Sequence, residues 1–293
     1  MKNLCLRPSD PYVLEPFRIR LEPKERFSFV ASRLPDMFQR FLSDKPSRLF
    51  LFLTAFFVAN ALIAECIGNK LFSLEALLGL PVRPFTLLGQ EGLTYTLTCG
   101  VLLWPLEFVL TDIINEYYGP RAVRRISYIA VALIGYAFLA FYLAIHMPAD
   151  DGFWRGSQRA NGIPDMQVAF EGIFGQSMRI IAGSLVAFLV SQVLDVWIFH
   201  RIKRKTGERK VWLRATGSTA VSQLVDSFIV LAIAFGPLWG WQRVLAVGLV
   251  NYSYKLVVAI LLTPVIYAAE RRIETSFGKD LTAQLKAEAM GKN

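Results

Sequence analysis

Residues 49–68 read LFLFLTAFFVANALIAECIG, and this stretch decides the class of fold. Its only charged side chain is Glu65, and a helix of this length, rising about 1.5 Å per residue, spans the roughly 30 Å hydrocarbon core of a bilayer. Lipid offers the backbone no hydrogen bonds, so a spanning segment this long is a helix, whereas a barrel strand needs only about ten residues of alternating polarity. The stretch therefore predicts a transmembrane helix.

Five further apolar stretches approach or exceed this length, so we predict an all-α integral membrane protein with a bundle of six transmembrane helices. The composition agrees, since 19% of the residues are charged and the mean hydropathy is +0.41, whereas soluble proteins carry about 25% charged residues. We expect a transmembrane domain over residues 48–269, between an N-terminal cytoplasmic segment, 1–47, and a C-terminal cytoplasmic tail, 270–293. The predicted spans are 49–68, 93–116, 127–147, 176–199, 218–236 and 244–268.

The net charge of +9 comes largely from basic residues between the predicted spans. The positive-inside rule places such loops in the cytoplasm, which puts both termini inside and leaves 69–92 and 148–175 outside as lids or variable connectors. Charge distributed in this way predicts orientation and argues against nucleic-acid binding. The basic residues of the two inner loops are Arg121, Arg124 and Arg125, then Arg201, Lys203, Arg204, Lys205, Arg209, Lys210 and Arg214.

The cysteines and histidines do not form a pattern typical of a disulfide framework or a metal site. Cys5, Cys66 and Cys99 have no paired spacing, and His146 and His200 fall at opposite ends of predicted spans. We therefore expect no metal and no cofactor. The first 45 residues contain no apolar core, so no cleavable signal peptide is expected. In the C-terminal tail, Leu281, Leu285 and Ala289 stand at helical spacing and predict a short helix, to which we assign no chemistry.

One internal repeat appears when the chain is compared with itself at an offset of 31 residues. Residues 190–195 read VSQVLD and residues 221–226 read VSQLVD. The first copy lies on a predicted span entering the cytoplasm and the second on a span leaving it, so the copies run in opposite directions. Inverted repeats that enclose a substrate site are common in secondary transporters, although small and polar residues also recur where membrane helices simply pack. The repeat is compatible with both interpretations.

Ionisable side chains inside the predicted spans point to a polar interior. Exposing all of them to lipid would cost on the order of 20 kcal/mol, because a charge at the bilayer centre costs about 3 kcal/mol on insertion scales. Glu65 and Glu116 stand at span ends, where they can reach the interface, whereas Glu107, Asp226 and Lys255 are deeper. The full set is Glu65, Glu107, Asp112, Glu116, Asp195, Asp226 and Lys255.

Helical spacing groups these side chains on shared faces, because residues four apart stack. Ser191 stacks with Asp195, and Ser222 with Asp226. Lys255 can form an internal ion pair with Asp226 or Glu107, which stability alone would explain, and we expect it both to pair and to gate a solute pathway. Such a surface suits a planar heterocycle with a guanine-like edge, and it also suits an amino acid, a vitamin or a proton relay. The candidate substrate-binding residues are Asp195, Asp226, Gln192, Gln223, Asp112, Glu107, Lys255 and Asn251, with no catalytic residue among them.

At these residues the sequence resembles the queuosine precursor transporter family, which is similar to vitamin uptake transporters of the bacterial inner membrane. The resemblance implies uptake of 7-cyano-7-deazaguanine or 7-aminomethyl-7-deazaguanine, precursors of queuosine in tRNA. This chain departs from the family pattern in its long N-terminal segment and longer outer loops. The resemblance covers 111–267 through four motifs, namely Thr111-Asp112 with Gly119 and Arg124-Arg125; Arg179 with Gln192, Asp195 and Val196; Gly217-Ser218-Thr219 with Asp226; and Tyr252 with Lys255, Pro264 and Tyr267.

The charged residues of the predicted spans are also compatible with two other functions. An intramembrane aspartyl enzyme using Asp195 and Asp226 is disfavoured, because neither residue stands in the Gly-x-Gly-Asp context of such proteases. A substrate-capture subunit of a vitamin or nucleobase uptake system, served by a separate energy-coupling complex, remains the alternative. The expected partners are a small-molecule substrate and membrane lipid, without nucleic acid, and the sequence leaves homo-oligomer formation open.

Overall fold

The computed structural model describes residues 39, 43–175, 178–207 and 211–291. Most of the predicted N-terminal segment, including Cys5, lies outside the described residues. The chain divides into two units, Met1–Arg48 and Leu49–Asn293, and the description below concerns the second.

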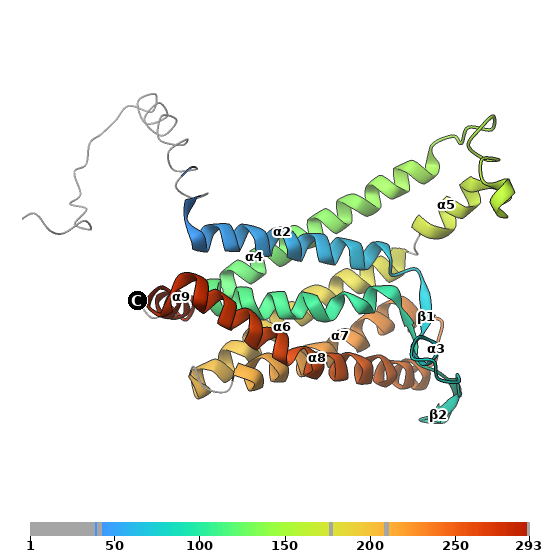
Figure 1. Cartoon of the computed structure of the whole chain (residues 1–293). Helices are drawn as coiled ribbons and strands as arrows, with labels where there is room; N and C mark the ends of the chain where they lie inside the picture. The colour runs from blue at the N-terminus through green and yellow to red at the C-terminus, as the bar shows by residue number, and fades with distance from the viewer. Residues whose placement is uncertain (1–38, 40–42, 176–177, 208–210, 292–293) are drawn as a thin grey trace, which may run out of the picture. The chain divides into compact units, whose positions relative to one another are not determined.

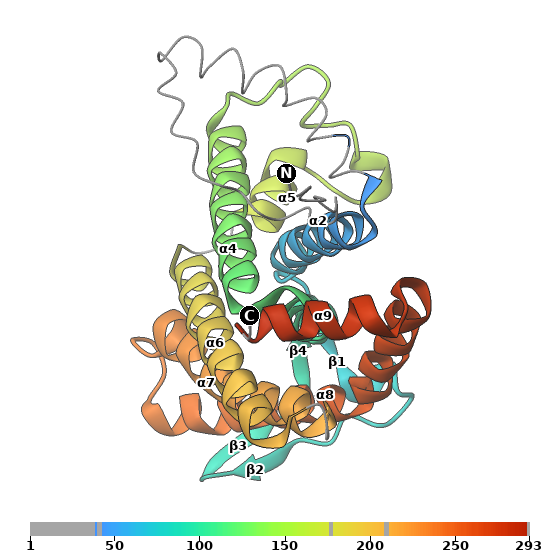
Figure 2. The same cartoon turned by 90° about the vertical axis from the view of Figure 1, so that its left-hand side faces the viewer.

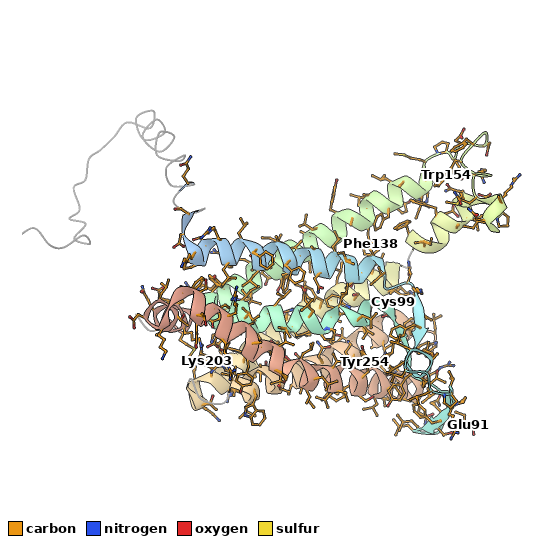
Figure 3. All side chains as sticks on the ribbon, viewed as in Figure 1. Glu91, Cys99, Phe138, Trp154, Lys203 and Tyr254 are labelled. Atoms are coloured by element: carbon orange, nitrogen blue, oxygen red, sulfur yellow. The ribbon has the colours of Figure 1, made fainter. Side chains whose placement is uncertain are left out.

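Within the described residues, five helices are long and apolar enough to cross a membrane (Figure 1). Large apolar side chains are exposed along all five, as expected where lipid is the solvent (Figure 3). The multi-pass membrane class predicted from the apolar stretches is therefore confirmed. The five helices are α2 (Lys45–Cys66), α4 (Trp104–His146), α6 (Met178–Thr206), α7 (Val211–Phe235) and α8 (Trp241–Phe277).

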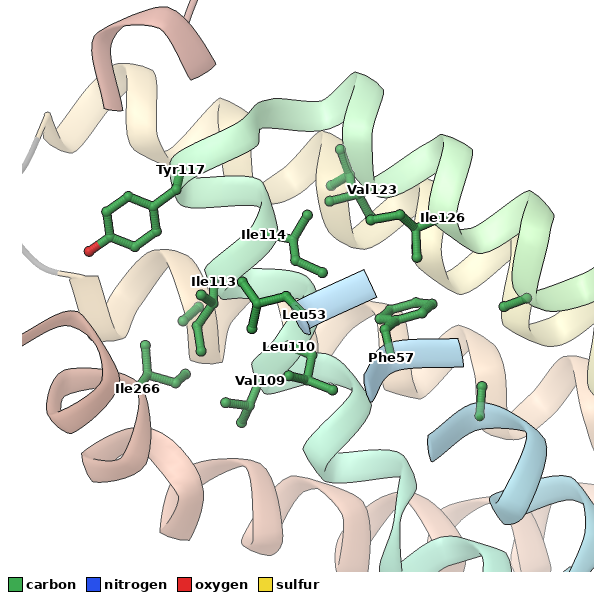
Figure 4. Packing of buried hydrophobic residues seen from close by; sticks show 14 of the residues in the cluster. Leu53, Phe57, Val109, Leu110, Ile113, Ile114, Tyr117, Val123, Ile126 and Ile266 are labelled. Atoms are coloured by element: carbon green, nitrogen blue, oxygen red, sulfur yellow. The ribbon is translucent and has the colours of Figure 1, made fainter. Parts of the chain in front are cut away.

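Helix α4 is broken at Gly119, where φ is 78° and ψ is 177°. This conformation favours a residue without Cβ, and the following Pro120 lacks the N–H that a continuous helix would use. The chain doubles back at the break, so Tyr117 and Val123 lie on two different helical arms (Figure 4). The two arms contain most of predicted spans two and three. The prediction of a separate loop carrying Arg121, Arg124 and Arg125 is wrong, because these residues are helical.

The segment between α2 and α4 contains short strands, so the prediction of a purely helical chain is wrong there. Strand β1 (Leu71–Ser73) pairs antiparallel with β4 (Thr96–Thr98), and β2 (Phe85–Leu87) pairs with β3 (Gln90–Leu93). Helix α3 (Leu74–Leu77) follows β1, and a 3-10 turn, η1 (Cys99–Leu102), precedes α4. The predicted start of the second span at residue 93 is thus eleven residues too early.

Glu75 holds this strand-containing segment together. Its carboxylate accepts the backbone N–H of Tyr95 at 2.8 Å and the hydroxyl of Ser73 at 2.8 Å. The Tyr95 hydrogen bond lowers the pKa of Glu75, because it favours the charged form.

The segment between α4 and α6 contains two short helical elements. The predicted outer loop 148–175 contains a 3-10 turn, η2 (Arg159–Asn161), and α5 (Met166–Phe174), whose N-cap Asp165 accepts the N–H of Gln167 at 2.8 Å. Helix α8 runs to Phe277, beyond its predicted end at residue 268. The predicted helix of the C-terminal tail is confirmed as α9 (Lys279–Ala289), which packs against α4.

The long helices meet through small residues and a buried apolar cluster. Helix α6 packs along α7, and α7 packs against α8 (Figure 2). A Cβ added at Gly248 of α8 would lie 2.5 Å from the ring of Phe228 on α7, so this contact requires glycine. The core around Leu53, Phe57 and Ile114 joins α2 to both arms of α4 (Figure 4).

Candidate functional site

The two copies of the VSQ repeat face each other across the contact between α6 and α7. Ser222 of the second copy donates its hydroxyl to Asp195 of the first at 3.0 Å. In the opposite sense, Ser191 of the first copy lies 3.4 Å from the Oδ1 atom of Asp226 in the second. Each carboxylate is therefore held by the serine of the other repeat. This reciprocal pattern follows from antiparallel packing of two helices that carry serine and aspartate four residues apart.

Lys255 pairs with Asp226 and not with Glu107, the other predicted partner. Its ammonium group lies 2.6 Å from Oδ2 of Asp226, and both side chains retain some exposure. Glu107 points elsewhere and accepts the side-chain amide of Asn60 on α2 at 2.8 Å. The ion pair therefore joins α7 to α8, while Glu107 joins α4 to α2.

A small cavity lies between α4, α7 and α8, beside this ion pair. Asp112, Gln223 and Lys255 bring a carboxylate, an amide and an ammonium group to its wall, and Phe108 adds an aromatic ring. Among the described residues, neither Nε2 of Gln223 nor Oδ1 of Asp112 has a hydrogen-bond partner. Buried polar atoms are seldom left in this condition, so the cavity is equipped to bind a polar molecule or water. Three of the eight predicted site residues thus line one cavity.

The other predicted site residues surround this cavity or lie apart from it. Asp195 is fully buried, and Thr219, which lines the cavity, lies 3.5 Å from its carboxylate. Gln192 accepts the hydroxyl of Thr111 at 3.2 Å and so links α6 to α4. Asn251 is half-buried and is not a lining residue of the cavity. Reasoning from sequence overlooked Asn60 and gave no role to Thr111, although both are polar residues within apolar stretches.

A second group of charges, which the sequence analysis did not recognise, is buried near the Gly119 break. Glu116 is 3% exposed and pairs with Arg214 of α7 at 2.8 Å and with Lys203 of α6 at 2.9 Å. On α9, Lys286 lies 3.4 Å from Glu270 of α8, and Glu270 is also 3.8 Å from Arg214. The expectation that Glu116 reaches the membrane interface is wrong, because protein groups cover and pair it. Arg214 and Lys203, which were predicted as charges of a loop, are likewise buried and paired.

The described residues contain no group of three histidine, cysteine or acidic side chains suited to a metal ion. His200 instead lies 2.7 Å from the side-chain oxygen of Asn115, and Glu65 accepts the hydroxyl of Ser184. Cys66 and Cys99 are free thiols. The polar interior of the described residues is built from carboxylates, amides, hydroxyls, an imidazole and cationic groups, which are groups that form hydrogen bonds and ion pairs.

The chain is similar in sequence to known families of transporters. Residues 98–269 match the family described as "Putative vitamin uptake transporter". The chain is 35% identical over 184 residues to the "Probable queuosine precursor transporter" of Bacillus subtilis, covering 62% of this chain and 74% of that protein. It is 26% identical over 181 residues to the "Queuosine precursor transporter" of Escherichia coli, covering 61% of this chain and 72% of that one. No solved structure matches.

These relatives are transporters by name, in agreement with the prediction that the chain is not an enzyme. A transporter of this kind has a small-molecule substrate and a lipid environment, and in bacteria it is a multi-pass protein of the inner membrane. The matched region contains α4, α6, α7 and most of α8, the helices that carry the reciprocal repeat and the cavity. The chain belongs to the vitamin-uptake-like family of queuosine precursor transporters.

Proposed function

We propose that this chain imports a 7-deazaguanine precursor of queuosine, either 7-cyano-7-deazaguanine or 7-aminomethyl-7-deazaguanine, across the bacterial inner membrane. The observation that carries the proposal is the cavity of Asp112, Gln223 and Lys255 beside two repeats that exchange serine–aspartate contacts. The names of the relatives support the substrate class.

The chemistry of the cavity wall suits the edge of a 7-deazaguanine. This ring presents an N–H and an amino group side by side, which one carboxylate accepts together, next to a carbonyl oxygen that needs a donor. Asp112 supplies the carboxylate, while Gln223 or Lys255 supplies the donor. The cavity measures about 20 Å³ in this state, so we expect Phe108, on the same wall, to contact the flat face of the ring once the helices open the cavity. Asp195, Asp226, Gln192 and Glu107 complete the binding set as the helices rearrange, and Asn251 is not needed.

The proposed pathway crosses six spans, with the two arms of α4 counted separately and both termini in the cytoplasm. The arginine and lysine residues at the end of α6 support this orientation through the positive-inside rule. Residues 48–269 then form the transport domain, with 1–47 and 270–293 as cytoplasmic segments. The ion pair between Lys255 and Asp226 is the proposed gate, because separating it frees a carboxylate and an ammonium group beside the cavity.

Uptake of labelled 7-cyano-7-deazaguanine by cells that lack the precursor pathway tests the proposal. Cells expressing this chain should accumulate label, and the Asp226→Asn and Lys255→Gln variants should each reduce the rate at least tenfold. The matched control is Glu91→Gln on an exposed strand, which should leave the rate unchanged. If cells that contain the unmodified chain in their membrane accumulate no label, the proposed substrate is wrong.

A charge-swapped variant, Asp226→Lys with Lys255→Asp, separates a transport site from a structural ion pair. The swap keeps two opposite charges facing each other across α7 and α8, so a purely structural pair would regain uptake. We expect the swapped chain to be inserted and folded but inactive. Purified chain in liposomes should also transport the base unaided; transport that requires an added energy-coupling complex would instead identify a substrate-capture subunit.

A further inference from the structure

A basic groove lies on the surface near the Gly119 break, away from the cavity of the proposed transport site. Its walls come from the second arm of α4, from α6 and from the end of α9. Four arginines line it, two on α4 and two on α6, with Trp197 beside them and Glu288 on α9. The basic groove is defined by these residues, namely Arg121, Arg124, Arg201, Arg204, Trp197 and Glu288.

Among the described residues, no carboxylate neutralises the positive charge of the basic groove. None of the four arginines forms an ion pair with a carboxylate in this part of the chain. Glu288 is turned toward its own helix, where it accepts the amide of Gln284 at 2.9 Å. The guanidinium of Arg201 lies over the ring of Trp197 at 5.1 Å, which holds it at the groove. The described structure therefore gathers four cations that an anionic ligand can contact.

Helix α6 shows the polarity gradient of a membrane surface along one face. Val186, Val190, Val193, Trp197 and Arg201 follow at intervals of three or four residues, and the first four are all exposed, Trp197 by 56%. The stripe passes from aliphatic through aromatic to cationic side chains. This is the order in which a helix meets acyl chains, the interface and the phosphate layer of a bilayer.

The second arm of α4 repeats this order in a neighbouring position. Arg121 and Arg124 are followed by the exposed Tyr128 at the same helical spacing. A void of only about 10 Å³ lies between this arm and α6, and its lining includes Arg124 and Val193. Both residues also line the basic groove, so the arm and α6 are packed closely beside it. The arm also begins at Pro120, where a helix N-terminus adds partial positive charge.

We propose that the basic groove binds the phosphate headgroup of an anionic phospholipid, with one acyl chain lying along the exposed aliphatic face of α6. The clustered arginines account for the phosphate, and Val186, Val190 and Val193 account for the chain. A free phosphate ion would use the arginines and leave this aliphatic face unused. The position of the arginines at the end of the aliphatic face therefore favours a lipid.

Native mass spectrometry of the purified full chain tests this site with phosphatidylglycerol and with phosphatidylcholine of the same chain length. The unmodified chain should retain phosphatidylglycerol more strongly, and inorganic phosphate in large excess should not displace it. The double variant Arg124→Gln with Arg201→Gln should weaken phosphatidylglycerol binding about thirtyfold, from the usual attraction of two surface arginines for anionic lipid.

A double variant of equal charge on the same helices is the matched control. Arg125 and Lys205 are exposed neighbours that do not line the basic groove, so Arg125→Gln with Lys205→Gln should leave lipid binding within about twofold of the unmodified chain. Equal loss in both double variants would overturn the proposal in favour of diffuse surface charge. Equal binding of the two lipids, or displacement by inorganic phosphate, would overturn it as well.

Discussion

Replacing Glu116 by glutamine removes a negative charge that lies within 3 Å of two buried cations. Arg214 is 0% exposed and Lys203 is 1% exposed, and their nitrogen atoms lie 2.8 and 2.9 Å from the Glu116 carboxylate. Removing one partner from a buried ion pair costs about 3 to 5 kcal/mol of the free energy of unfolding. Glu270 still lies 3.8 Å from Arg214, so we expect the lower end, about 3 kcal/mol. That loss corresponds to a fall in Tm of about 6 to 12 °C.

Thermal unfolding of the purified full chain in detergent, followed by tryptophan fluorescence, measures this effect. Adding Lys203→Met to the Glu116→Gln variant removes one of the two cations that faced Glu116, so it should recover about half of the lost Tm. Glu91→Gln makes the same chemical change on an exposed strand and should shift Tm by about 1 to 2 °C at most. A Glu116→Gln variant as stable as this control, or a double variant less stable than the single one, would refute the reasoning.

Two further predictions concern packing and pH. Gly248→Ala should lower Tm, because the new Cβ would lie 2.5 Å from the ring of Phe228 and overpacking costs about 1 to 3 kcal/mol. Adding Phe228→Leu to this variant should restore Tm. An unchanged Tm in the single variant would contradict the close contact. The lowered pKa of Glu75 stabilises its segment above the unfolded pKa, and this contribution is lost as pH falls through the folded pKa. Hydrogen exchange of the Tyr95 amide, corrected for its intrinsic rate, should therefore accelerate on acidification below about pH 4, and Glu75→Gln should abolish this change.

Local patterns were sufficient to predict the membrane class and the polar interior. Runs such as 49–68 need no tertiary information, because bilayer thickness alone fixes the length of a spanning helix. The spacing of Ser191 and Asp195, and of Ser222 and Asp226, also placed each pair on one helix face before any contact was known. The short strand pair of Leu71–Ser73 and Thr96–Thr98 was missed, because three-residue strands give almost no periodic signal.

The apolar runs, their helical faces and the inverted repeat were determined by the sequence alone, since they depend on residues close together in the chain. Only the tertiary structure decided that Lys255 pairs with Asp226 and not Glu107, and that Glu116 meets Arg214 across 98 positions. It also decided that two of the predicted spans join directly at Gly119 as the two arms of α4, with no loop between them. Periodicity specifies the face on which a charge lies, whereas its partner depends on how helices far apart in the chain pack together.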